Sequence, residues 1–346
     1  MNRLSGARGG ERLSLLTAGG RVELRDLTGH HVHAVARAAG VPDTGSATLR
    51  GDADVRVTVD RGHRGFVVDG LRPVTRGVGA GHGRVVMHSV GGSGFDQVWD
   101  LRGETVEVRS RWAPGLLERG AAVLQSRHQA LRAQVLLHYP ALWWAGTRGL
   151  APLHVSVLEV DGVVVLLAGP GGVGKSTLVA QAVADGARAT CDNVAVSDGT
   201  TVHGLREAMR LDAGASQAQP AGRATTHGRR ELAWHSQVPS LRPDLVVVLR
   251  RGDGPRLRAV EPEVAQRALV AGTFAAGELR RFWTLTAVLG LATGHGPVLP
   301  AVEETARRIC TALPCVELEL GDRPGPSLRE MLAPRLDQVR VAGAAR

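Results

Sequence analysis

One short segment constrains this chain more than any other. Residues 169–176 read Gly-Pro-Gly-Gly-Val-Gly-Lys-Ser and match the pattern G-x-x-x-x-G-K-[ST] at every defined position. An uninterrupted apolar run, Val163–Ala168, precedes the loop, and a helix predicted from Lys175 to about Asp185 follows it. Strand, glycine-rich loop and helix in this order predict a loop whose backbone N–H groups surround the phosphates of a nucleotide.

The loop assigns a role to several side chains. Lys175 is predicted to bridge the β- and γ-phosphates of ATP, and Ser176 to hold Mg²⁺. Thr177 can assist from the start of the helix. The predicted ATP-binding residues are Gly169, Gly171, Gly172, Val173, Gly174, Lys175, Ser176 and Thr177.

Lysine usage supports this interpretation. The chain has 42 lysines and arginines together, and Lys175 is the only lysine among them. Lysine is a compact point charge and arginine a planar fork, so the two are not interchangeable on a phosphate. A chain that otherwise uses arginine has kept lysine at the one position where the loop requires it.

Composition limits the classes of partner and the cellular compartment that the sequence predicts. The net charge is +9, but the arginines are scattered among 33 acidic residues, with no basic run interleaved with aromatics. We therefore expect no nucleic-acid partner. No apolar run is long enough to span a membrane, so no membrane partner is expected either. Three cysteines without metal-binding spacing favour a reducing, cytoplasmic location.

The chain reads as three parts: a β-rich module over 1–112, a connecting helix within 113–150, and a P-loop kinase-like α/β domain over 151–335. Alternating apolar residues with glycine between them predict strands in the first part. A helix is expected from Gly115 to Leu137, ending before Pro140. The predicted strands of the first part are 54–59, 65–68, 84–87 and 105–109.

The last part alternates apolar strands with helices, which predicts a sheet covered by helices on both faces. A tight turn is expected at Asp161-Gly162, and a mobile loop over Asp212–Thr226. The predicted strands are 154–160, 163–168, 245–249 and 316–320, and the predicted helices are 175–185, 262–271, 278–289 and 303–313.

The kind of P-loop protein follows partly by exclusion. The Asn-Lys-x-Asp element that reads guanine needs a second lysine, and the chain has none. A Leu-Ser-Gly-Gly signature of transporter ATPases is also missing. The strand 245–249 runs into Arg250-Arg251 rather than an acid, so the nearest candidate for a metal-orienting carboxylate is Asp192. Asp192 can alternatively be an ordinary turn residue, because Asp-Asn is common in turns.

Four positions then resemble a known family. His154, Gly169, Lys175 and Asp192 follow one another as in the kinase domain of HPr kinase/phosphorylase. The resemblance covers about 153–211 well, 229–320 only by its order of elements, and not the first 110 residues. It implies a kinase acting on a Ser or Thr of a protein, with Asp192 and His154 in the active site, and a homo-oligomer. The second acid of the family's Asp pair is Asn193 here, and 204–210 takes the place of its glutamate-containing signature.

The predicted function is therefore an ATP- and Mg²⁺-dependent kinase whose acceptor is a hydroxyl of a protein, a peptide or a small molecule. Lys175, Asp192 and His154 are the predicted catalytic residues, and Ser176 and Asp192 the metal ligands. A nucleotide-dependent switch or assembly ATPase is the alternative, and a protein that binds ATP without turnover is a third. The candidate arginines for transition-state charge are Arg206, Arg210, Arg280 and Arg281. Arg229-Arg230 are predicted to lie in a loop that can approach the substrate.

Overall fold

The computed structural model of the protein describes residues 10–41, 51–62, 64–115, 119–120, 126–212, 223–224, 229–232, 237–321 and 325–344. The chain divides into two compact units. Met1–Arg148, Thr225–His227 and Arg281–Leu299 form the first unit, and Gly149–Ala224, Gly228–Arg280 and Pro300–Arg346 form the second. Helices and several sheets occur together, so the chain has a mixed α/β structure.

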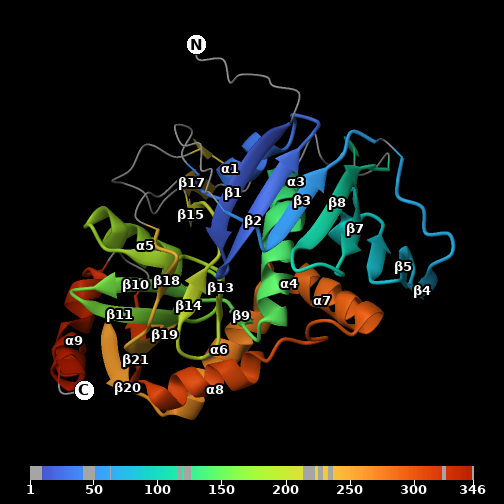
Figure 1. Ribbon diagram of the computed structural model, residues 1–346. Coiled ribbons are helices and arrows are strands. Elements are labelled where there is room, and N and C mark those ends of the chain that lie inside the picture. Colours follow the sequence, from blue (N-terminus) through green and yellow to red (C-terminus); the bar gives the residue numbers. More distant parts are fainter. Residues whose placement is uncertain are drawn as a thin grey trace. The chain divides into compact units, whose positions relative to one another are not determined.

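The first unit contains an eight-stranded sheet in the order β1-β2-β3-β8-β7-β6-β5-β4 (Figure 1). Its strands alternate as the sequence predicts: in β3, Val55, Val57 and Val59 are buried while the residues between them are half-buried. The predicted strands 54–59, 84–87 and 105–109 are confirmed. The bounds are β1 (Glu11–Thr17), β2 (Gly20–Asp26), β3 (Val55–Val59), β4 (Arg72–Thr75), β5 (Val78–Gly81), β6 (Arg84–Met87), β7 (Phe95–Asp100) and β8 (Val106–Trp112).

The predicted strand 65–68 is wrong. Residues Gly65–Val68 have no strand structure. The Phe66 ring instead lies under the guanidinium of Arg111, 4.2 Å from the ring centroid. This cation–π contact holds the segment by one side chain rather than by backbone pairing. An alternating pattern of only four residues does not show whether a neighbouring strand is available to pair with them.

The connecting helix also differs from expectation, because it does not end before Pro140. Within the described residues it runs through α3 (Ser126–Ala133), a π-helical turn (Gln134–His138) and α4 (Tyr139–Thr147). Pro140 lies in the first turn of α4. The wider π-turn changes the hydrogen-bond pattern just before the proline, so its missing N–H and bulky ring are accommodated.

These helices complete the core of the first unit. The Gln97 side chain of β7 donates a hydrogen bond to the Val135 carbonyl at 2.9 Å, and the rings of Trp99 and Trp143 meet edge to face. The sheet is thereby fixed to the helix by one buried polar contact and one aromatic contact. The remaining helices of this part are α1 (Val32–Ala38), the short 3-10 helix Val90–Gly92 and α7 (Arg280–Thr293).

The second unit is built on a six-stranded sheet in the order β12-β10-β11-β19-β21-β20. Strands β11, β19 and β21 are parallel neighbours, and the others run antiparallel to their neighbours. The carboxyl ends of the three parallel strands therefore lie at one edge, where ligands of such sheets bind. The bounds are β10 (Ser156–Val160), β11 (Val163–Ala168), β12 (Ala189–Cys191), β19 (Leu245–Arg251), β20 (Arg256–Ala259) and β21 (Cys315–Leu320).

Helices cover both faces of this sheet, as the apolar strands predict. Alternate residues of β11, such as Val165 and Leu167, join one cluster with Leu178 of α5 and Leu332 of α9. Helix α6 contacts β11, β19 and β21, and α8 packs on α6. The bounds are α5 (Lys175–Ala184), α6 (Pro262–Ala275), α8 (Val302–Ala312) and α9 (Leu328–Ala344).

The predicted strand 154–160 is divided between two sheets. Its second part is β10, whereas β9 (Ala151–Leu153) pairs with β13 in a four-stranded sheet of order β18-β14-β13-β9. His154 and Val155 lie at the break. The turn at Asp161-Gly162 is confirmed, since both residues have positive φ. The bounds are β13 (Ala195–Ser197), β14 (Val202–Gly204) and β18 (Ser240–Leu241).

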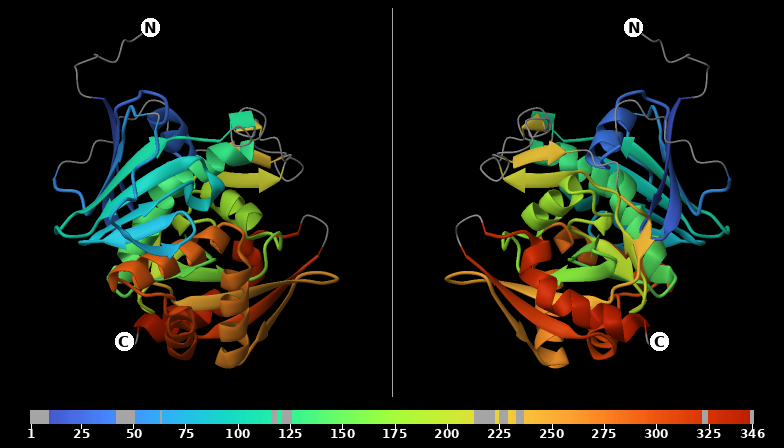
Figure 2. Two further views of the ribbon diagram at one scale, coloured as in Figure 1. Left: turned by 90° about the vertical axis from the view of Figure 1, so that its right-hand side faces the viewer. Right: turned by 90° about the vertical axis from the view of Figure 1, so that its left-hand side faces the viewer.

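A third sheet of the second unit has the order β15-β17-β16, with β15 (Met209–Asp212), β16 (Arg223–Ala224) and β17 (Arg229–Leu232). Figure 2 shows β15 and β17 side by side. Arg229 and Arg230 therefore belong to a strand, and their predicted place in a loop is wrong. Most of the loop predicted over Asp212–Thr226 lies outside the described residues.

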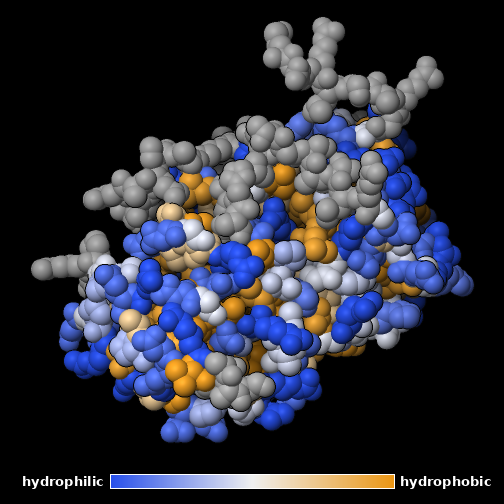
Figure 3. All heavy atoms as spheres, turned by 60° about the vertical axis from the view of Figure 1, so that its left-hand side comes forward, coloured by the Kyte–Doolittle hydropathy of each residue, from blue (hydrophilic) through white to orange (hydrophobic). Residues whose placement is uncertain are grey.

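Several exposed charged side chains are joined in ion pairs, for example Arg84 with Asp100 and Arg188 with Glu159. On the face drawn in Figure 3, hydrophilic residues are interspersed with smaller hydrophobic areas. Among the described residues, no helix combines the length and the apolar character needed to cross a bilayer.

Candidate active site

The predicted phosphate loop, residues 169–176, joins β11 to α5 at the carboxyl edge of the parallel strands. Gly169, Gly172 and Gly174 all have positive φ, with values of 146°, 77° and 117°. A Cβ on Gly169 would approach the Leu249 carbonyl oxygen to 2.9 Å, so only glycine fits there. The sequence thus uses glycine where the chain bends sharply against the neighbouring strand β19.

Lys175 begins α5 and points back into the loop. Its Nζ donates hydrogen bonds to the carbonyl oxygens of Gly169 at 2.8 Å and Pro170 at 3.1 Å. Only 5% of the residue is exposed. Burial lowers the pKa of Lys175 to about 8, opposed by the negative charges of Asp192 and Glu278. The ammonium group therefore remains charged near neutral pH because two acids lie close to it.

Asp192 follows β12 and is buried, with only 3% of the residue exposed. Burial raises its pKa to about 6, opposed by hydrogen bonds from the Ser176 side chain and the Arg210 backbone N–H and by the charge of Lys175. Its Oδ1 atom has no hydrogen-bond partner among the described residues. The structure thus brings Lys175, Ser176 and Asp192 together, although Asp192 is separated from the loop by the whole of α5.

These contacts fit a divalent cation. Hydroxyl and carboxylate oxygens are the ligands that Mg²⁺ prefers, and it normally keeps further positions for phosphate and water. The Ser176 side chain lies close enough to Asp192 to lower the pKa of its carboxyl, and the free Oδ1 of Asp192 leaves a buried acceptor for a cation. Within the described chain, no cluster of three or more His, Cys, Asp or Glu residues can hold a metal by itself. The donor set therefore fits a metal that is shared with a nucleotide.

Glu207 is a second buried acid at this site, and the sequence did not single it out. Its Oε1 accepts a hydrogen bond from the Val194 N–H at 3.1 Å, and 4% of the residue is exposed. Burial raises its pKa to about 8; the positive charge of Arg210 opposes this shift and the negative charge of Asp192 adds to it. Glu207 is therefore mainly protonated at neutral pH. The one available signal was its position in 204–210, the segment that the sequence comparison set beside the glutamate-containing signature of HPr kinase/phosphorylase as a resemblance only.

The raised pKa of Glu207 makes a stability prediction. Its ordinary value is 4.5, so the folded state holds this proton more tightly than the unfolded state does. The resulting stability is fully present below about pH 4.5 and is lost as the pH rises through about 8. We expect the Tm of the wild-type protein to fall more between pH 5 and 9 than the Tm of Glu207→Gln. The control is Glu263→Gln at an exposed position of α6, which should follow the wild type. Parallel pH profiles for the wild type and Glu207→Gln would contradict the assignment.

His154 lies beside the same site but pairs with Asn193 and not with Asp192. Its Nε2 atom is 2.9 Å from Asn193 Oδ1, and its backbone N–H donates to the Thr273 hydroxyl at 3.1 Å. Burial, together with the charge of Lys175, lowers the pKa of His154 to about 4. A neutral imidazole that donates through Nε2 to the amide oxygen holds the 192–193 turn in place.

Of the four arginines named as candidates for transition-state charge, Arg210 is the one whose charge acts on both Asp192 and Glu207. It also forms an ion pair with Glu231, at 3.7 Å. Arg206 is largely buried, which lowers its pKa. Arg280 is exposed at the start of α7, and Arg281 lies in the first unit against Gly91. Thr177 is half-buried in the first turn of α5.

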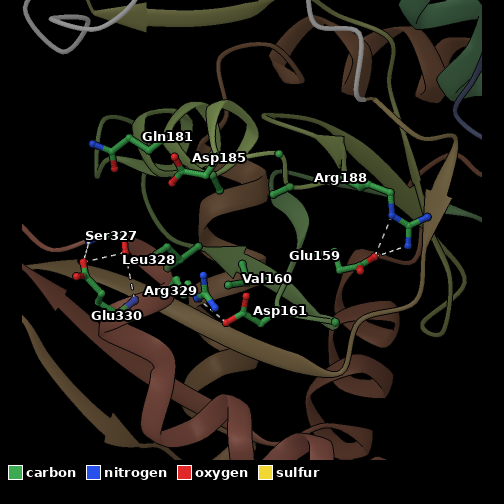
Figure 4. A pocket seen from close by; sticks show the side chains of 14 residues that line it. Glu159, Val160, Asp161, Gln181, Asp185, Arg188, Ser327, Leu328, Arg329 and Glu330 are labelled. Atoms are coloured by element: carbon green, nitrogen blue, oxygen red, sulfur yellow. Dashed lines mark hydrogen bonds and ion pairs between the residues drawn. The ribbon is translucent and has the colours of Figure 1, made fainter.

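A cavity of about 760 Å³ lies elsewhere in the second unit (Figure 4). It is formed by the turn between β10 and β11, the end of α5 and the start of α9. Because the turn stands at the amino end of β11, the cavity is at the opposite edge of the sheet from the phosphate loop. Its charged groups are joined to one another, as in the pairs Glu159–Arg188 and Asp161–Arg329. We therefore do not assign this cavity to the predicted nucleotide site.

Three kinds of known protein were compared with the chain: family models, curated proteins and solved structures. No protein-family model matches the chain, and no curated protein matches it. Among solved structures, the HPr(Ser) kinase/phosphatase from Coxiella burnetii is similar over 56% of this chain and 93% of that chain, with 11% sequence identity and a TM-score of 0.27. A TM-score this low does not establish a shared fold. Membership of that family therefore stays a prediction from the sequence.

Proposed function

We propose that this chain is an ATP- and Mg²⁺-dependent phosphotransferase that moves the γ-phosphoryl group to a hydroxyl acceptor. The acceptor is a Ser or Thr of a protein or peptide, or a small alcohol. The observation that carries the proposal is the buried Asp192 beside Lys175 and Ser176, with one carboxylate oxygen free. Burial raises the pKa of this acid to about 6, which suits a group that accepts a proton near neutral pH.

Each residue then has a defined role, and Asp192 has two. Lys175 neutralises the β- and γ-phosphates, and Ser176 with Asp192 would hold Mg²⁺, which supplies charge neutralisation between the phosphates. Asp192 orients the acceptor hydroxyl and takes its proton as the phosphoryl group leaves ATP. Arg210 lies close enough to influence Asp192 and Glu207, and it can supply positive charge to the transferred group.

The same groups predict a pH profile. Asp192 must be ionised to accept a proton, and its pKa is about 6. Lys175 must be protonated to hold the phosphates, and its pKa is about 8. We therefore expect kcat/KM to rise with pH through about 6 and to fall through about 8, giving a bell-shaped profile for the free enzyme. Initial rates from pH 5 to 9 at constant ionic strength check this. A rate that rises steadily to pH 9 would contradict the role of Lys175.

Transfer of label tests the function itself. Purified protein is incubated with γ-labelled ATP, Mg²⁺ and either a cell lysate or a set of small alcohols, beside a matched sample that contains EDTA. We expect a protein or a small molecule to gain label only when Mg²⁺ is present. If ATP is hydrolysed and nothing gains label, the result favours a nucleotide-dependent switch or assembly ATPase. Binding of ATP without any turnover would favour a protein that has lost catalysis.

A further inference from the structure

Arg251 ends β19 next to the phosphate loop. Its Nη2 atom donates to the Gly172 carbonyl at 3.4 Å, and its Nη1 atom donates to the Gly321 carbonyl at 3.1 Å. Gly172 belongs to the loop, and Gly321 follows the end of β21. One guanidinium therefore connects the loop to the carboxyl ends of two neighbouring parallel strands.

The charge of Arg251 is unusual for this position. An acid that orients the metal commonly ends the strand beside a phosphate loop, and here a cation stands in its place. Arg250, one residue earlier, pairs with Glu317 at 3.4 Å. Among the described residues, no carboxylate forms an ion pair with Arg251. Its positive charge thus remains available at the rim of the loop.

We propose that Arg251 is a positioning residue of the nucleotide site, which braces the Gly172 peptide so that the loop holds the phosphates. This inference rests on the proposed function, since it concerns the same nucleotide. A donor on the Gly172 carbonyl polarises the peptide unit whose N–H belongs to Val173. That N–H now makes a long contact with the Pro170 carbonyl, at 3.4 Å. A polarised N–H is a stronger donor for a phosphate oxygen.

The bracing also limits the movement of the loop. Gly171 and Gly172 are exposed, and glycine has the most conformational freedom to lose on ordering. When one of their carbonyls is already fixed before the nucleotide binds, the loop loses less conformational entropy on binding. The effect should appear in nucleotide affinity and not in the rate of phosphoryl transfer, because Arg251 contacts the backbone and no reacting group.

The test compares two adjacent arginines of one strand. Affinities of ATP and ADP are measured by calorimetry for the wild type, Arg251→Ala, Arg251→Lys and Arg250→Ala. We expect Arg251→Ala to weaken both nucleotides about tenfold, the loss typical of one charge-assisted hydrogen bond. Arg251→Lys should recover part of the loss, since an ammonium can keep one of the two contacts. Arg250→Ala removes the same charge from the same strand and should bind both nucleotides as the wild type does.

The possible results separate this inference from the proposed function. A wild-type chain that binds neither nucleotide overturns both. If the wild type binds and Arg251→Ala binds equally tightly, only the bracing role fails. A loss of affinity for ATP alone in Arg251→Ala would place the guanidinium on the γ-phosphate and overturn the bracing role. An equal loss of affinity in Arg250→Ala would also overturn the bracing role. Where an acceptor is known, KM for ATP should rise about tenfold in Arg251→Ala while kcat stays within about twofold. Unchanged far-ultraviolet circular dichroism and Tm confirm that the exposed substitution leaves the fold intact.

Discussion

Lys175→Ala is expected to abolish turnover while the protein remains folded. The variant removes the only point charge of the loop, and the phosphates then lose a charge-assisted contact that nothing else in the loop supplies. Of the two carbonyls that Lys175 now binds, that of Pro170 becomes free to accept a hydrogen bond from water, because Pro170 is exposed. Label transfer from ATP and direct ATP binding should both fall below detection.

Lys175→Arg is expected to be nearly as inactive. The guanidinium is larger and planar, and it enters a site where the ammonium contacts two carbonyl oxygens and only 5% of the lysine is exposed. The control is Arg188→Ala, which removes a positive charge from the exposed pair with Glu159 at the other edge of the sheet. That variant should keep full activity. Full activity in either Lys175 variant would show that the phosphates bind elsewhere.

Asp192→Asn should separate binding from chemistry. The amide keeps the size of the carboxylate but cannot take a proton, so kcat should fall by about 100-fold or more. The affinity for ATP should change only a few-fold, because Lys175 and the loop backbone remain. Steady-state rates and calorimetric binding measure the two effects independently.

A matched substitution controls for the loss of a carboxylate. Asp185 follows α5 and is exposed, so Asp185→Asn should leave both kcat and ATP affinity unchanged. If Asp192→Asn turns over as fast as the wild type, then Asp192 is a turn residue and some other group orients the acceptor. Equal losses in both variants would point to a general effect of net charge.

Much of the fold was predictable because its signals are local. The run Val163–Ala168 is apolar throughout, and the glycines after it leave few conformations for the loop, so β11 and the start of α5 follow from the sequence. The break at His154 was not predictable, since it depends on β9 and β10 pairing with strands of different sheets. Pro140 gives the same lesson, because the π-turn that precedes it and lets the helix continue cannot be read from the sequence.

The proximity of the predicted site residues followed from the sequence where a motif fixes both residue type and spacing. The sequence named Lys175, Ser176 and Asp192, and the structure brings them together. Glu207 was missed because nothing in an isolated glutamate shows that it will be buried beside another acid. The contacts of Arg251 with Gly172 and Gly321 join three separate segments, and such contacts exist only once the sheet has formed.

Because Lys175 is buried, proteolytic cleavage after this residue can report local opening of the protein. Since this is the only lysine in the chain, a protease that cuts solely after lysine has one peptide bond to attack. That bond lies in the first turn of α5, and only 5% of the lysine is exposed, so cleavage requires the loop and helix to open. When reclosing is faster than cleavage, the rate of this single cut measures the free energy of opening. A ligand that binds the closed loop must slow the cut, and two fragments on a gel are then enough to rank ligands.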